Sequence, residues 1–127
     1  LGDVYKRQVI SPIGLNQSSI NENDSILNIN ADFVASEIAR NLKADKLIYQ
    51  TDVDGIRDYK GSIISKMTLT QAKDLINTGI VVGGMLPKLE SCINSMQGVD
   101  RSHIINGSDN SLIEIFKGNR TGTEIIN

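Results

Sequence analysis

Strand-like runs alternate with helical segments along most of the chain, and this alternation limits the fold more than any other feature. Residues 46–51 (KLIYQT) are typical of a buried strand. They follow NADFVASEIARNLKA (residues 30–44), in which apolar side chains recur at helical spacing. Strands that alternate with helices are typical of α/β domains with helices packed on a parallel sheet. We therefore predict a three-layer αβα sandwich with a mainly parallel sheet, in one domain of 127 residues.

Local signals fix several helix ends. Asn30 is a predicted N-cap of a helix that runs to about Lys43, and Thr68 with Gln71 forms a predicted capping box. Gly79 is the predicted C′ residue of that second helix. Two more helices are expected at residues 85–97 and 111–116. Further strands are expected at residues 9–13, 25–27, 62–65, 102–106 and 122–126, with a surface loop or hairpin at residues 15–24.

Composition excludes several classes of protein. The formal net charge of −2 gives no broad basic face for nucleic acid, and no apolar run is long enough to cross a membrane. The single cysteine, Cys92, excludes an internal disulfide and favours a cytoplasmic location, and we expect it to be packed and unreactive. Residues 1–8 (LGDVYKRQ) show no periodicity, and we interpret them as a non-native or ragged end beside a domain at residues 9–127.

In open α/β sheets, ligands bind outside the carboxyl ends of strands, where loops lead into helices, and three places in this sequence fit that position. Asn28, Asn30 and Asp32 stand at the first junction, where their alternative role is to cap a helix. Residues 51–55 (TDVDG) follow the buried strand; an acidic pair there can hold a metal or a ribose, although Asp-Gly is also an ordinary turn.

The third junction, residues 83–88 (GGMLPK), combines two glycines with a lysine at a helix start. Glycines let backbone N–H groups approach a ligand, and a helix N-terminus favours an anion. A lysine in the first turn opposes the helix dipole, so Lys88 costs stability unless an anion lies beside it. This argument favours a functional role. No Walker motif, zinc spacing or Ser/His/Asp arrangement is present, and we interpret His103, the only histidine, as a hydrogen-bonded structural residue.

These pieces, in this order, resemble the C-terminal half of the acetylglutamate kinases of the amino-acid kinase superfamily. The resemblance covers nearly all of residues 9–126 and rests on VISPIG, LNINAD, ADKLIYQTDVDGI, GGMLPK, the strand with His103 and the closing TGT. It implies transfer of the ATP γ-phosphoryl group to the side-chain carboxylate of N-acetyl-L-glutamate, with Mg²⁺ held mainly by the phosphates and no metal held by the protein. Such an enzyme belongs to arginine synthesis.

The resemblance also implies a role for each matching residue. Lys88 would neutralise the transferring phosphoryl group, Asp32 would position the catalytic lysines, and Asn28 would bind acetylglutamate. ATP would be held by Asp52, Val53, Asp54, Gly55, Ile56, Arg57, Ile80, Val81, Val82, Gly83 and Gly84. The family's glycine-rich phosphate loop, second catalytic lysine and substrate arginine have no counterpart here, so we expect the chain alone to be inactive.

Regulation by arginine is a further expectation from the resemblance. His103, Glu114 and Gly122 resemble residues of arginine-inhibited members, which tend to be homo-oligomers. The segment between His103 and Glu114 is about two residues shorter than the usual pattern, and a second histidine is absent.

Three other interpretations remain open from the sequence. One is a sister kinase that acts on aspartate, glutamate, carrier-bound aminoadipate or UMP. Another is a non-catalytic module that binds a nucleotide or an amino acid. The third is a folded domain in which the glycines only form turns. This interpretation leaves the polar residues at three separate junctions unexplained.

Overall fold

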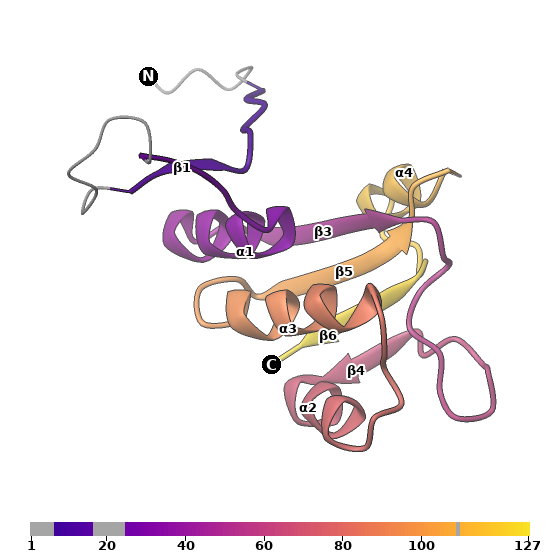
Figure 1. Ribbon diagram of the computed structural model, residues 1–127. Helices are drawn as coiled ribbons and strands as arrows, with labels where there is room; N and C mark the ends of the chain where they lie inside the picture. Colours follow the sequence, from indigo (N-terminus) through magenta and orange to yellow (C-terminus); the bar gives the residue numbers. More distant parts are fainter. Residues whose placement is uncertain (1–6, 17–24, 109) are drawn as a thin grey trace.

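A four-stranded sheet forms the centre of the molecule (Figure 1). The computed structural model describes residues 7–16, 25–108 and 110–127. The strand order is β3 (Lys46–Thr51), β5 (Arg101–Asn106), β6 (Thr123–Ile126) and β4 (Lys66–Thr68). The β3–β5 and β4–β6 pairs are parallel, and β5–β6 is antiparallel. The predicted α/β fold with a mainly parallel sheet is therefore confirmed.

The helices cover the two faces of this sheet unequally. Helices α1 (Ala31–Leu42), α2 (Leu69–Asn77) and α3 (Met85–Ser95) pack against one another on one face. On that face, the Tyr49 hydroxyl of β3 donates to the Asp32 carbonyl of α1 at 2.6 Å, and the Ser102 hydroxyl of β5 lies 2.8 Å from that of Ser95 in α3. Because side chains alternate along a strand, His103 lies on the other face, where α4 (Ser111–Phe116) packs.

The helix ends follow the predicted local signals. The Asn30 side chain accepts a hydrogen bond from the Phe33 N–H at 3.1 Å and so caps α1. Thr68 and Gln71 form both bonds of a capping box at the start of α2. Gly79 follows α2 with φ 69°, a left-handed conformation that glycine adopts without strain.

Two of the predicted strands are displaced. Residues 62–65 do not join the sheet, because residues 57–63 turn back around Asp58, whose carboxylate accepts from the N–H groups of Lys60 and Ser62 at 2.9 Å each. Pairing with β6 starts only at Lys66, and Thr68 ends β4 because it also caps α2. The strand predicted at residues 9–13 is instead β1 (Ile13–Leu15).

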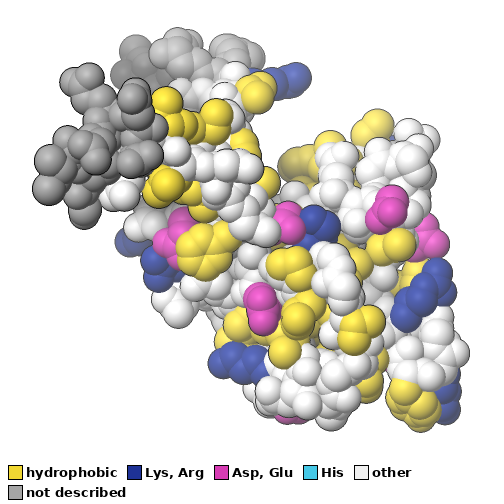
Figure 2. Space-filling model, viewed as in Figure 1, with side chains coloured by type: hydrophobic (Ala, Val, Ile, Leu, Met, Phe, Trp, Pro, Cys, Tyr) yellow, Lys and Arg dark blue, Asp and Glu magenta, His cyan; other side chains and the backbone are white. Residues whose placement is uncertain are grey.

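A small hairpin lies outside the core. Strand β1 pairs antiparallel with β2 (Ile26–Asn28), as the hairpin prediction requires, and residues 17–24 lie outside the described part. Ile13, Leu15 and Ile26 are exposed, and hydrophobic side chains are visible at the surface over this hairpin (Figure 2). The core itself lies between the sheet and the helices and includes Leu47, Tyr49, Ile56, Leu89, Cys92, Ile104 and Ile125. In the described residues, no helix is both long and apolar enough to span a bilayer.

Candidate active site

An ion pair joins the first turns of two helices. The Lys88 ammonium of α3 donates to both carboxylate oxygens of Asp32 in α1, at 2.9 Å each. The two side chains are 22% and 18% exposed, so the pair is shielded yet reachable from solvent. Fifty-six residues separate the partners in sequence, and only the packing of α1 against α3 brings them together.

This ion pair answers the question of why a lysine stands at a helix start. Lys88 opposes the α3 dipole, so its position is unfavourable unless an anion lies nearby. Asp32 is that anion, so the position of Lys88 does not by itself require a bound phosphate. A ligand that carries more negative charge than Asp32 can still compete for the same ammonium group, since Lys88 retains a third N–H donor.

Tyr49 of β3 contacts both residues of the ion pair, a role that the sequence did not predict. Its hydroxyl donates to the backbone carbonyl of Asp32, and the Lys88 nitrogen lies 5.9 Å from the centre of its ring. Burial raises the pKa of this hydroxyl well above its ordinary value, so it remains a protonated donor. A tyrosine in the otherwise aliphatic centre of a buried strand is the sequence signal that could have indicated this contact.

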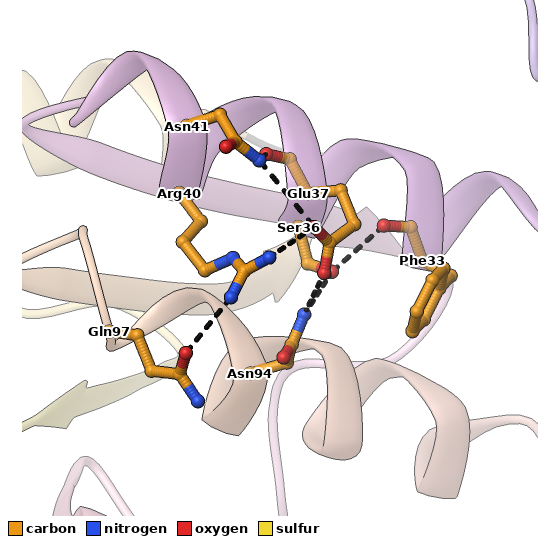
Figure 3. A network of polar contacts seen from close by, with 7 residues as sticks. All are labelled: Phe33, Ser36, Glu37, Arg40, Asn41, Asn94 and Gln97. Atoms are coloured by element: carbon orange, nitrogen blue, oxygen red, sulfur yellow. Dashed lines mark hydrogen bonds and ion pairs between the residues drawn. The ribbon is translucent and has the colours of Figure 1, made fainter.

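A network of polar contacts joins α1 to α3 farther along both helices than the ion pair (Figure 3). The Glu37 carboxylate accepts from Asn94 at 2.7 Å and from Arg40 at 2.6 Å, and Arg40 also donates to Gln97 at 2.9 Å. Hydrogen bonds from Asn94 and Arg40 hold the pKa of Glu37 below its ordinary value. Because this network ties together the helices that carry Asp32 and Lys88, it fixes the relative position of those two side chains.

A cavity of about 530 Å³ opens beside the ion pair. This volume lies in the range of small-molecule sites. Its walls come from α1, the end of β3 and the start of α3: Asp32, Thr51, Asp52, Val53, Gly84, Met85, Pro87 and Lys88. The first turns of two helices meet here, and helix N-termini favour anions. The cavity can therefore hold a phosphate-bearing ligand between a lysine and two helix ends.

The loop after β3 is anchored by its own contacts. Asp52 lines the cavity and accepts from the Thr51 hydroxyl at 3.1 Å, whereas Asp54 accepts from Asn106 at 2.8 Å and lies 3.7 Å from Arg57. The Ile56 N–H donates to the Thr123 hydroxyl at 2.8 Å. Gly55 has φ 147°, and a Cβ there would lie 2.8 Å from that hydroxyl, so only glycine fits.

The predicted ATP residues are therefore only partly together. Asp52, Val53 and Gly84 line the cavity, whereas Gly55, Ile56 and Val81 are buried and do not line it. Ile80, Val82 and Gly83 are exposed in the segment that leads into α3. Asn28 is exposed on β2 and does not line this cavity, so its role as an acetylglutamate ligand stays a prediction.

The three candidate arginine-effector residues lie away from the ion pair, around the opposite face of the sheet. His103 lines a separate cavity there; Glu114 accepts from Lys117 at 2.8 Å and from Asn119, while Gly122 packs against Ile104 and Ile105. The Nε2 atom of His103 has no hydrogen-bond partner among the described residues, which differs from the structural histidine that we expected.

Cys92 is fully buried, and burial raises the pKa of its thiol far above the ordinary value, in agreement with the predicted unreactive packing. Within residues 7–16, 25–108 and 110–127, no group of three or more His, Cys, Asp or Glu side chains could hold a metal ion.

Several known proteins are similar to this chain in sequence and in fold. Acetylglutamate kinase of Sulfurihydrogenibium sp. (strain YO3AOP1) is 41% identical over 120 residues, which make up 92% of this chain and 38% of that enzyme. N-acetylglutamate synthase from Neisseria gonorrhoeae, complexed with coenzyme A and L-arginine, has a TM-score of 0.74 at 29% identity, covering 83% of this chain and 25% of that one. Carbamate kinase from Giardia lamblia bound to AMP-PNP has a TM-score of 0.71 at 26% identity, covering 91% of this chain and 41% of that one.

The curated relatives are much longer than this chain, which spans 38% of the first and 40% of another, the acetylglutamate kinase of Hydrogenobaculum sp. (strain Y04AAS1). Residues 5–106 match the Amino acid kinase family, and these residues include the Asp32–Lys88 pair, the cavity beside it and strands β3 to β5. The chain belongs to the amino acid kinase family.

Proposed function

We propose that this chain forms the ATP-binding part of an acetylglutamate kinase, which transfers the ATP γ-phosphoryl group to the side-chain carboxylate of N-acetyl-L-glutamate. The observation that carries the proposal is the Asp32–Lys88 pair at the mouth of a 530 Å³ cavity between two helix N-termini. Acetylglutamate kinase relatives at 41% to 45% identity support the choice of acceptor. The carbamate kinase relative bound to AMP-PNP supports a nucleotide as the donor.

Phosphoryl transfer to a carboxylate needs positive charge and alignment more than it needs a general base, because the acceptor is already ionised. Lys88 supplies an ammonium group that can contact the equatorial oxygens of the transferring phosphoryl group. Asp32 holds that ammonium with two hydrogen bonds and so limits its motion before the nucleotide binds. The Glu37–Asn94 hydrogen bond adds a second contact between the two helices that carry these side chains.

The residues fit a magnesium ion that is held mostly by the nucleotide. Asp52 is the carboxylate on the cavity wall that is free of an ion pair among the described residues, and Mg²⁺ is commonly bound through one or two carboxylates plus substrate phosphates. Asp52 would therefore be a single protein ligand to an ion held mainly by the phosphates, which differs from our sequence-based expectation of no metal ligand in this chain. When bound, the ion neutralises negative charge on the phosphates.

The test uses the complete enzyme that contains this chain. Acyl phosphate formed from ATP is trapped with hydroxylamine, with N-acetylglutamate, aspartate, glutamate and carbamate as separate acceptors. We expect N-acetylglutamate to be the preferred acceptor by at least tenfold in kcat/KM. Efficient transfer to one of the other acceptors, with none to N-acetylglutamate, would show a sister kinase instead.

A non-catalytic nucleotide-binding module is the alternative from another class. It predicts that ATP binds the complete protein without transfer to any acceptor. The ion pair favours the kinase, since it orients the lysine beside the cavity, whereas a module that only binds nucleotide would gain from it in stability alone. We expect the 127-residue chain by itself to show no turnover, because it spans only 38% of its kinase relative.

Arginine feedback, homo-oligomer formation and a cytoplasmic location stay predictions from the sequence. The N-acetylglutamate synthase relative was solved with L-arginine, which supports an arginine site in this group of proteins. If arginine regulates the complete enzyme, it should lower kcat/KM and raise the melting temperature. An unchanged rate and melting temperature at saturating arginine would exclude regulation.

A further inference from the structure

Tyr49 brings a hydroxyl group into a position where packing needs none. It shares one face of β3 with Leu47, and both side chains belong to the hydrophobic core. Tyr49 is only 6% exposed, and a buried hydroxyl costs free energy unless it finds a hydrogen-bond partner. A phenylalanine would fill the same space without this cost. The hydroxyl therefore indicates a contact that serves more than the packing of the core.

The partner of this hydroxyl is the backbone of Asp32. The hydroxyl donates to the Asp32 carbonyl at 2.6 Å, between residues 17 positions apart. Asp32 lies in the first turn of α1, which Asn30 caps through the Phe33 N–H. This first turn is thus tied to the sheet as well as capped. The bond fixes the backbone from which the Asp32 carboxylate reaches Lys88.

The ring of Tyr49 contacts the other member of the ion pair. The Lys88 nitrogen lies 5.9 Å from the ring centre, at the outer end of the range of about 6 Å in which a ring attracts a cation. The ring adds this weak attraction to a nitrogen that the Asp32 carboxylate already holds. Lys88 and Asp32 line the 530 Å³ cavity, whereas Tyr49 does not. Tyr49 can therefore act on a ligand there only through the ion pair.

A second contact between a tyrosine and a lysine lacks these features. The Lys60 nitrogen lies 5.4 Å from the ring centre of Tyr59, but the two residues are neighbours in sequence. Tyr59 is 78% exposed, and such contacts are weak where water surrounds them. Burial and the bond to Asp32, rather than the distance from a ring to a cation, therefore distinguish Tyr49. Tyr59 provides a matched control.

We propose that Tyr49 is a positioning residue for phosphoryl transfer, which holds Asp32, and through it the Lys88 ammonium group, in the orientation that the transition state needs. The proposal rests on the proposed function, because it assigns Tyr49 a role in the same reaction. Burial raises the pKa of the Tyr49 hydroxyl well above its ordinary value, so the hydroxyl keeps its proton and acts as a donor rather than as a base.

The kinetic signature of this role is a loss of kcat without a loss of substrate binding. An interaction that matters only in the transition state lowers kcat when it is removed and leaves KM unchanged. In the complete enzyme, Tyr49→Phe should lower kcat about fivefold, the size of effect that one hydrogen bond has, with KM for ATP within about twofold of wild type. Tyr49→Leu also removes the ring and should lower kcat about 20-fold. Tyr59→Phe should leave both constants unchanged. Each rate is divided by the concentration of folded enzyme, measured by ATP-binding titration.

A double-mutant cycle separates positioning from a structural defect. In the Lys88→Met enzyme there is no ammonium group to orient, so Tyr49→Phe should change the remaining kcat by less than about twofold. A defect in packing alone would lower kcat by the same factor in both backgrounds. The cycle is measured with the acceptor that the complete enzyme prefers.

Three results would overturn the proposal: a wild-type kcat in both Tyr49 variants, a raised KM at unchanged kcat, or equal losses of kcat with and without Lys88. Failure of the proposed function is seen in the wild-type enzyme instead. A wild type that transfers phosphate to no acceptor would refute both proposals before any variant is compared. Preference for an acceptor other than N-acetylglutamate would refute the choice of substrate, and the Tyr49 cycle would then be decided with that acceptor.

Discussion

The two faces of the sheet differ in how far their cationic side chains are paired with carboxylates. On the α1–α3 face, Lys88 has a dedicated partner in Asp32, and a second layer of contacts through Glu37 and Asn94 holds the helices that carry them. On the α4 face, Lys46, Lys66, Arg101 and Arg120 have only Glu124 between them. A cation with a fixed partner is held in one orientation, whereas cations that outnumber their partners leave positive charge uncompensated at the surface. Four predictions test the first half of this comparison.

The largest effect is expected at Lys88. In the complete enzyme, Lys88→Met should lower kcat by about 10²–10³-fold, because removal of one group that stabilises the transition state has this cost. Steady-state phosphoryl transfer measures it. Lys73→Met, on the exposed surface of α2, is the matched control and should stay near the wild-type rate. Similar losses in both variants would contradict a specific role for the ion pair.

Gly55 anchors the loop that carries Asp52. Gly55→Ala should lower the free energy of unfolding by about 2–3 kcal/mol, because φ 147° is strained for alanine and the new Cβ would crowd Thr123. Gly61→Ala is the control: it has φ 83° but no neighbour within 4 Å, so it should cost less. Urea denaturation of the two variants separates steric crowding from backbone strain, and equal losses would show that the contact with Thr123 is unimportant.

Asp32 is expected to contribute less to stability than to the orientation of the Lys88 ammonium group. Asp32→Asn should lower the free energy of unfolding by about 1–2 kcal/mol, since it leaves a partly shielded ammonium without its charged partner. Asp45→Asn, in the exposed turn before β3, provides the control and should be close to neutral. If the Asp32→Asn enzyme kept the wild-type kcat, the ion pair would not be needed for catalysis.

The smallest effect is a pH dependence at Glu37. The pKa of Glu37 is lowered from 4.5 in the folded state, so its ionised form stabilises the fold above pH 4.5, and this contribution is lost as the pH falls through the lowered pKa. The stability difference between wild type and Glu37→Gln should therefore shrink on acidification from about pH 6 to about pH 3. Urea midpoints across this range measure it, with Glu90→Gln on the exposed side of α3 as the control. A constant difference would exclude this linkage.

Much of the fold could be predicted because its signals are local. The Asn30 cap, the Thr68–Gln71 capping box and the strand at Lys46–Thr51 each depend on residues within a few positions of one another. The strand predicted at residues 62–65 was wrong because that prediction also used local signals alone. Its apolar pattern is local, and so is the competing turn around Asp58, but the strand that pairs with Lys66 is β6, far along the chain.

The candidate site also combines features that depend on local sequence with features that depend on long-range contacts. The sequence by itself determined the α/β class, most of its elements, and the polar residues at two strand ends and at the start of α3. Only the tertiary structure decided that the anion beside Lys88 is Asp32, that Tyr49 and the Glu37–Asn94 bond support this pair, and that four cations gather on the opposite face. The physical reason is that caps and periodicity act within one or two turns, whereas these contacts need helix packing and strand register to bring together residues as far apart as Asp32 and Lys88.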